Sequence, residues 1–69
     1  MTRAEFDDRL RYAGLRKKDL ATLLGQKPSH ISQLGRTKPV QRYVLSVIAA
    51  WEFMSSAKRQ EWLAQSEAE

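Results

Sequence analysis

Cysteine is absent from this chain of 69 residues, and histidine occurs only once. The chain therefore has no disulfide framework and no thiolate nucleophile, and one histidine cannot supply a multi-histidine metal site. The longest uninterrupted apolar run, Val47 to Trp51, is five residues long, whereas a membrane-spanning helix needs roughly 18 or more. The amino terminus carries no apolar signal segment. We expect no metal, no cofactor, no membrane contact and an intracellular location.

The short length limits the chain to one domain, predicted over residues 1–65, with an acidic tail over residues 66–69 that frays. A domain of this size buries only about 60% of the surface of its unfolded chain, which leaves little room for a deep pocket. Two pairs of side chains could suggest catalysis, but neither pair has the geometry of a catalytic pair. Ser29 and His30 are adjacent and do not face each other on a helix, and Asp7 and Asp8 diverge by about 100°. We expect no catalytic residue and no enzymatic activity.

Positive charge is concentrated in the middle of the chain. Residues 9–42 hold nine Lys or Arg and one acid, Asp19, a charge of +8, whereas the flanks hold three bases and seven acids, a charge of −4. A central basic block on an otherwise acidic small domain is expected of a protein that docks on a polyanion. The alternative is a solvated face without a partner, and charge alone does not decide between the two.

The apolar pattern predicts five helices and no strand. The expected helices span about residues 2–13, 17–24, 28–34 and 40–53, and a fifth begins at a serine at position 55 or 56. Thr2 and Glu5 have the spacing of a capping box, and Gly14 suits the left-handed conformation that ends a helix. Pro28 suits the first position of the third helix. The predicted fold class is all-α, with the fourth helix as the central element of the core.

Residues 17–34 have the layout of a helix-turn-helix that reads DNA, two short helices separated by three to four residues. Ala21 is small where the two helices cross closely, and Gly25 lies where the chain turns sharply. The apolar positions that would hold the pair against the core are Leu20, Leu24, Ile31 and Leu34. The outward positions of the second helix are polar, which favours a binding function for that face.

The segments LRKKDLATLLG at 15–25 and SHISQL at 29–34, followed by a basic stretch and Pro39, resemble the phage-repressor family of helix-turn-helix proteins, the Cro/CI or XRE-like group. The resemblance covers about residues 4–54 and implies a compact five-helix bundle of the lambda-repressor-like helix-turn-helix type. The chain has Gln26 where the family usually has an apolar residue, Arg16 where Ser or Thr is common, and Gly35 where Glu is common. The last departure predicts a more adaptable loop over residues 35–38.

The resemblance also implies a function and the residues that perform it. A regulator of this family, here expected to be a repressor, binds a specific double-stranded DNA sequence by inserting its second motif helix, Pro28 to Leu34, into the major groove. The implied base-reading residues are Lys27, Pro28, Ser29, Ser32 and Gln33. The implied phosphate-binding residues are Lys17, Arg36 and Lys38, with Arg16, Arg42 and Tyr43 as further candidates. Such a protein acts in the cytoplasm of a prokaryote or is encoded by a phage.

The same resemblance implies a homodimer on an inverted-repeat operator, because one short helix reads only a few base pairs. The apolar candidates for the dimer interface are Trp51, Phe53, Met54, Trp62 and Leu63. In a chain this short, these residues are also candidates for the core.

Two other classes of function compete with DNA reading. One is an antitoxin or adaptor that uses the scaffold chiefly to hold a protein partner through its last helix. The other is a nonspecific binder of RNA or of a membrane surface. The short polar side chains of Ser29, Ser32 and Gln33 argue against a nonspecific polyanion binder, which would carry more Lys or Arg there. A pure protein adaptor has no need of the basic block.

Overall fold

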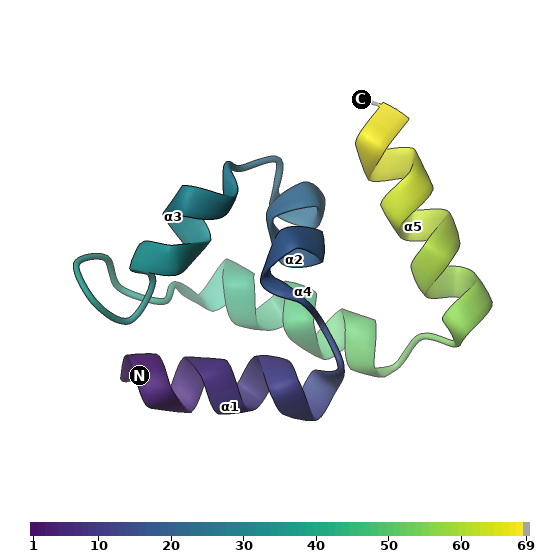
Figure 1. Cartoon of the computed structure of the whole chain (residues 1–69). Coiled ribbons are helices and arrows are strands. Elements are labelled where there is room, and N and C mark those ends of the chain that lie inside the picture. The colour runs from purple at the N-terminus through teal and green to yellow at the C-terminus, as the bar shows by residue number, and fades with distance from the viewer. Residues whose placement is uncertain (69) are drawn as a thin grey trace.

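A computed structural model describes residues 1–68 and contains five helices in this range (Figure 1). They are α1 (Arg3–Ala13), α2 (Lys17–Leu24), α3 (Pro28–Gln33), α4 (Arg42–Glu52) and α5 (Ser56–Ala68). Residues 1–68 contain no β-strand, only an isolated bridge between Leu34 and Lys38. The prediction of an all-α fold with five helices is confirmed. None of the helices in this range is both long and apolar enough to cross a membrane.

The first helix is delimited by its own end residues. The Thr2 hydroxyl accepts a hydrogen bond from the Glu5 N–H at 3.2 Å, and the Glu5 carboxylate accepts one from the Thr2 N–H at 2.9 Å. These reciprocal bonds form the predicted capping box. At the other end Gly14 adopts a φ of 67°, and the Leu15 N–H donates to the Leu10 carbonyl at 3.0 Å. Both predicted boundaries of α1 are therefore confirmed.

The capping box makes the stability of α1 depend on pH. Hydrogen bonding with the backbone and then the side chain of Thr2 holds the pKa of Glu5 below its usual value. Because the folded-state pKa is lowered, the carboxylate stabilises the fold above its unfolded-state pKa, and this contribution is lost as the pH falls through the folded-state pKa. We expect the Tm difference between the wild type and Glu5→Gln to be largest at neutral pH and to shrink below the usual glutamate pKa of about 4.3. Thermal unfolding monitored by circular dichroism measures it, and a pH-independent difference would contradict the capping role.

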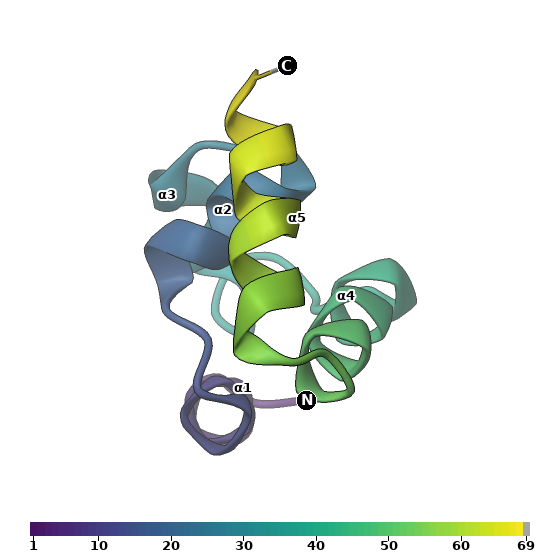
Figure 2. The ribbon, with the colours of Figure 1, turned by 90° about the vertical axis from the view of Figure 1, so that its right-hand side faces the viewer.

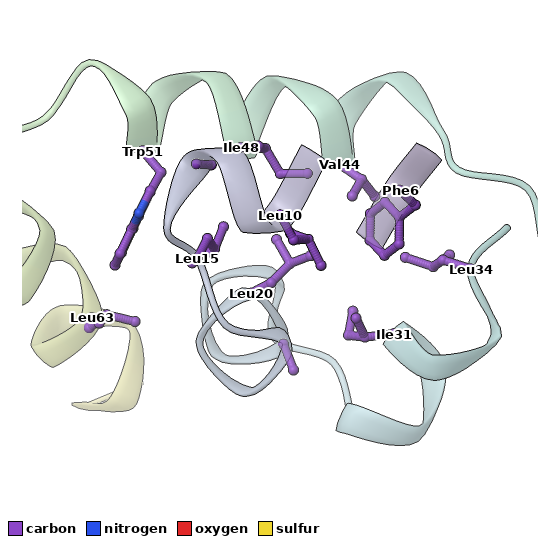
Figure 3. Packing of buried hydrophobic residues seen from close by; sticks show 12 residues of the cluster. Phe6, Leu10, Leu15, Leu20, Ile31, Leu34, Val44, Ile48, Trp51 and Leu63 are labelled. Carbon is purple, nitrogen blue, oxygen red and sulfur yellow. The ribbon is translucent and has the colours of Figure 1, made fainter. Parts of the chain in front are cut away.

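One hydrophobic core joins all five helices. The buried side chains are Phe6, Leu10, Ala13, Leu15, Leu20, Ala21, Ile31, Leu34, Val44, Ile48, Trp51 and Leu63. The central element is α2 and not the predicted fourth helix, because α2 contacts α3, α4 and α5, whereas α4 contacts α1 and α2. Trp51 and Leu63 lie at one end of the core, and Ile31 and Leu34 lie at the other (Figure 3). The packing therefore fixes α3 at one end of the molecule and α5 at the opposite end, where α5 runs alongside α2 (Figure 2).

Two helix boundaries differ from the sequence prediction. The predicted helix 40–53 is shorter, because Gln41 has an extended backbone and serves as the N-cap of α4, while Val40 stays outside the helix and packs half-buried against the core. The predicted helix 28–34 ends at Gln33, because Leu34 turns to an extended conformation that buries its side chain. In both cases tertiary packing, rather than local preference, sets the helix boundary: the start of α4 and the end of α3.

The carboxyl-terminal helix is longer than predicted. The Ser55 hydroxyl accepts a hydrogen bond from the Lys58 N–H at 3.3 Å, which caps the start of α5 as expected. Residues 66–68, predicted to fray, continue the helix, because no Gly or Pro interrupts the chain after Ser55. Glu69, the last residue of the predicted tail, lies outside the described residues.

Candidate nucleic-acid interface

The turn between α2 and α3 is built around Gly25. Its φ is 67°, and a side chain placed there would meet no atom within 4 Å. Gly25 is therefore needed for its left-handed backbone and not for space. The following residue, Gln26, donates its backbone N–H to the Ala21 carbonyl at 3.0 Å, and Ala21 is buried as expected for the small residue of the motif. These contacts hold the start of α3 against α2.

The helix α3 has one buried and one exposed side. Ile31 is fully buried and anchors the helix to the core. All the predicted base-reading residues lie on the solvent-exposed surface: Lys27, Pro28, Ser29, Ser32 and Gln33. Pro28 occupies the first turn of the helix as predicted, and the Ser32 hydroxyl donates to the Pro28 carbonyl at 3.3 Å. The polar side chains of Ser29, Ser32 and Gln33 are thus presented to solvent at one end of the molecule.

The loop after α3 is closed by hydrogen bonds of its own. The Gln33 carbonyl accepts from the backbone N–H groups of Arg36, Thr37 and Lys38 at 3.0 to 3.2 Å, and the Gly35 N–H donates to the Lys38 carbonyl at 2.8 Å. These bonds give the loop a defined conformation in the structure, whereas its adaptability stays a prediction. Gly35 has a φ of 79°, and a Cβ atom there would lie 2.9 Å from backbone atoms of Arg3. Glycine at this position permits close packing of two backbone segments.

Several basic side chains near α3 lack an acidic partner among residues 1–68. Residues 20–51 contain no Asp or Glu. Within residues 1–68, no ion pair involves the exposed side chains of Lys27, Arg36, Lys38 and Arg42. The cations outside this group mostly pair with carboxylates of α1, α2, α4 and α5. The end of α3, the following loop and the start of α4 therefore carry uncompensated positive charge.

The other predicted phosphate-binding cations are in a different environment. Arg16 Nε lies 3.1 Å from an Asp19 carboxylate oxygen, and Lys17 Nζ lies 3.4 Å from Asp7 Oδ1. Both side chains remain exposed, at 79% and 48%. Surface ion pairs of this kind contribute little stability and exchange readily with other anions. These two residues remain accessible to a polyanion, but part of their charge is already neutralised.

Sequence reasoning treated Gln26 as a departure from the family pattern and assigned it no role. In the structure its side-chain amide donates a 3.0 Å hydrogen bond to the hydroxyl of Tyr43, a predicted phosphate-binding residue. This bond joins the turn before α3 to the first turn of α4, beside a hollow also lined by His30 and Lys38. The signal in the sequence was a polar residue at an expected apolar position.

Sequence reasoning also missed Arg3, which comes from the first turn of α1. Its Nη1 donates to the carbonyl of Ile31 at 2.8 Å and to the carbonyl of Leu34 at 3.0 Å. The side chain is only 13% exposed. No local pattern identifies this contact, because it joins residues about thirty positions apart.

The candidate dimer residues fall into two groups. Trp51 and Leu63 are buried within the chain itself, at 4% and 8% exposure, and lie at the same end of the core. This corrects their assignment to a dimer surface. Phe53 is 91% exposed, and Met54 and Trp62 are half-buried beside a shallow hollow on α5. Only these three of the predicted residues offer apolar surface to a partner.

Comparison of the chain with protein-family models, curated proteins and solved structures finds no match. In the part of the chain that the structure describes, no group of three His, Cys, Asp or Glu side chains is arranged to hold a metal ion. Function is therefore inferred from the exposed face of α3 and the unpaired cations beside it.

Proposed function

We propose that the chain is a sequence-specific double-stranded DNA-binding transcriptional regulator of the lambda-repressor-like helix-turn-helix type. It represses transcription by occupying its site, with the exposed face of the segment Pro28 to Leu34 in the major groove and the Leu34 side chain in the core. The observation that carries the proposal is the exposed polar face of α3 beside the unpaired cations Lys27, Arg36, Lys38 and Arg42. A helix is about 10–12 Å across, and the major groove of B-DNA is about 12 Å wide, so this face can reach base edges.

The side chains on α3 suit base reading. The Gln33 amide can form paired hydrogen bonds with adenine, and the Ser29 hydroxyl can bond to purine or pyrimidine edges. Both are exposed. The cations of the neighbouring loop and of α4 suit phosphate binding, which sets position and orientation without reading sequence. Lys27 and Pro28 begin the helix, where Lys can donate to guanine and Pro can contact a thymine methyl group.

Strong salt dependence is the first expected property of duplex binding. Each phosphate neutralised on B-DNA contributes about 0.9 to the slope of log K against log salt, so the unpaired cations assigned to phosphate, Arg36, Lys38 and Arg42, predict a slope of about −3 per protomer. Duplexes selected from a random pool supply the site, and fluorescence anisotropy at several salt concentrations measures the slope. Single-stranded RNA of the same length is the control. Equal affinity for RNA and the best duplex, or a slope near zero, would refute the proposed function.

The proposal includes a homodimer on a two-fold site. A short recognition helix reads few base pairs, and a second copy doubles the site, with half-sites about 34 Å apart. The surface for this contact includes Phe53, Met54 and Trp62. Sites recovered in the same selection should contain an inverted repeat. A site without one, bound by a single protomer, would remove the dimer from the proposal and leave DNA binding in place.

The exposed Phe53 side chain favours a second candidate, an antitoxin or adaptor that holds a protein partner. Phe53 is 91% exposed, and Met54 and Trp62 extend the apolar surface, which suits a contact with another protein. In this candidate DNA binding is secondary, so it predicts at most a weak preference among duplexes. A strong preference in the selection experiment would therefore favour the transcriptional regulator.

A further inference from the structure

The side chain of Arg3 joins the start of α1 to the end of α3. Its Nη1 donates to the carbonyls of Ile31 and Leu34 at 2.8 and 3.0 Å. These carbonyls lie at the carboxyl-terminal end of α3, where the negative end of the helix dipole favours a cation and where the Ile31 carbonyl also accepts the Leu34 N–H at 3.2 Å. The Arg3 guanidinium therefore acts as a cap for α3 that comes from a distant part of the sequence.

Other contacts hold this guanidinium in place. Its Nε lies 3.3 Å from Asp7 Oδ1, one turn further along α1, and its Cζ lies 5.6 Å from the centroid of the Phe6 ring. The same Asp7 oxygen lies 3.4 Å from Lys17 Nζ at the start of α2. A chain of polar contacts thus runs from the start of α2 through α1 to the end of α3.

The backbone at the end of α3 meets the same residue. A Cβ atom at Gly35 would lie 2.9 Å from the Arg3 Cα and N atoms, so the two backbone segments are in direct contact. Elsewhere α1 packs chiefly on α4, whereas α3 packs chiefly on α2. The contact between α1 and the end of α3 therefore depends largely on Arg3 and Gly35.

We propose that Arg3 is a positioning residue that sets the orientation of the carboxyl-terminal end of α3 and of the loop 35–38 for DNA reading. This inference rests on the proposed function. Gln33 lies in the turn that Arg3 caps, and its carbonyl also accepts the N–H groups of Arg36, Thr37 and Lys38, so the loop follows the helix end. Arg3 is only 13% exposed, and its Nη1 already donates to two carbonyls of the protein, so we assign it no phosphate contact.

Replacement of Arg3 by lysine tests this role, because lysine keeps the charge but lacks the planar fork that serves two carbonyls and a carboxylate together. The matched control is Arg9→Lys. Arg9 is also on α1 and lies 3.1 Å from a Glu52 oxygen, so it ties α1 to α4 and not to α3. Affinities for the best selected duplex and for a random duplex are measured at several salt concentrations, with each variant corrected for its folded fraction.

We expect Arg3→Lys to lower the preference for the selected duplex roughly five- to tenfold, the lower part of the discrimination that one paired side chain and base supply. Its salt slope should equal that of the wild type, and Arg9→Lys should keep the wild-type preference. Asp7→Asn, which loosens the guanidinium but keeps its carbonyl contacts, should give a smaller loss in the same direction. An unchanged preference in Arg3→Lys would overturn the role.

Hydrogen exchange tests the positioning without DNA. In Arg3→Lys the amides of Arg36, Thr37 and Lys38 should exchange faster relative to those of α4, whereas Arg9→Lys should leave this ratio unchanged. If the wild type shows no preference among duplexes, the proposed function fails, and the exchange ratio still decides whether Arg3 orders the end of α3. An exchange ratio unaltered in Arg3→Lys overturns the inference.

Discussion

Replacement of Gly35 by alanine is expected to destabilise the protein by about 2–5 kcal/mol. The left-handed backbone costs a non-glycine residue roughly 1–2 kcal/mol, and forcing an extra carbon into a packed site costs about 1–3 kcal/mol more. At Gly35 both terms apply, because φ is 79° and the new Cβ would lie 2.9 Å from the backbone of Arg3. Small proteins are stable by only about 5–15 kcal/mol, so the loss is a large fraction of the total. Urea unfolding measures it.

Gly14→Ala is the matched control for this substitution. Gly14 also has a positive φ, 67°, but a Cβ atom there would meet nothing within 4 Å. Only the conformational cost of about 1–2 kcal/mol applies. Gly35→Ala should therefore be the more destabilising substitution. Equal losses of unfolding free energy at the two positions would show that the contact between Gly35 and Arg3 does not constrain the fold.

Arg36→Ala is expected to lower the affinity for every duplex, whereas Gln33→Ala is expected to relax the base preference. Arg36→Ala removes an unpaired, exposed cation, so affinity should fall for selected and random duplexes alike, and the salt slope should shrink by about one per protomer. Gln33→Ala, and likewise Ser29→Ala, should spare random-duplex binding and relax the preference at one or two base pairs by about 1–3 kcal/mol. Repeated selection with each variant, together with salt titrations, measures both quantities.

Lys58→Ala controls for the loss of one positive charge. Lys58 is 71% exposed on α5 and lies 3.6 Å from a Glu61 carboxylate oxygen, away from α3. Its removal should change neither the base preference nor the salt slope. If Gln33→Ala keeps the preference while Arg36→Ala alters it, the bases are read by the loop 35–38, and α3 is not the recognition helix.

The boundaries of the helices were largely predictable because their causes are local. The capping box of Thr2 and Glu5 spans four residues, and the glycines that close α1 and α2 act through their own backbone. Pro28 starts α3 for a similarly local reason. The periodic apolar residues then identified the buried side of each helix. Residue type and short spacing are sufficient for features of this kind.

The details of the candidate interface were less predictable because they depend on contacts between distant residues. The bond between Gln26 and Tyr43, and those between Arg3 and the end of α3, exist only once the helices have packed. The same is true of Gly35, whose role appears only beside the backbone of Arg3. Trp51 illustrates the limit for apolar residues, since helical spacing alone cannot say whether a neighbouring helix or a second chain covers it.

The two tryptophans give the molecule an intrinsic fluorescent probe that lies away from the exposed face of α3. Trp51 is buried under Arg59, whose Cζ lies 5.1 Å from the ring, at the end of the core opposite Ile31 and Leu34. Trp62 is half-buried on α5 beside Met54. The emission of Trp51 therefore follows unfolding of the core, whereas that of Trp62 is sensitive to anything that covers α5. A change in tryptophan fluorescence when duplex is added to the folded protein would thus signal association between protomers, not groove contact by α3.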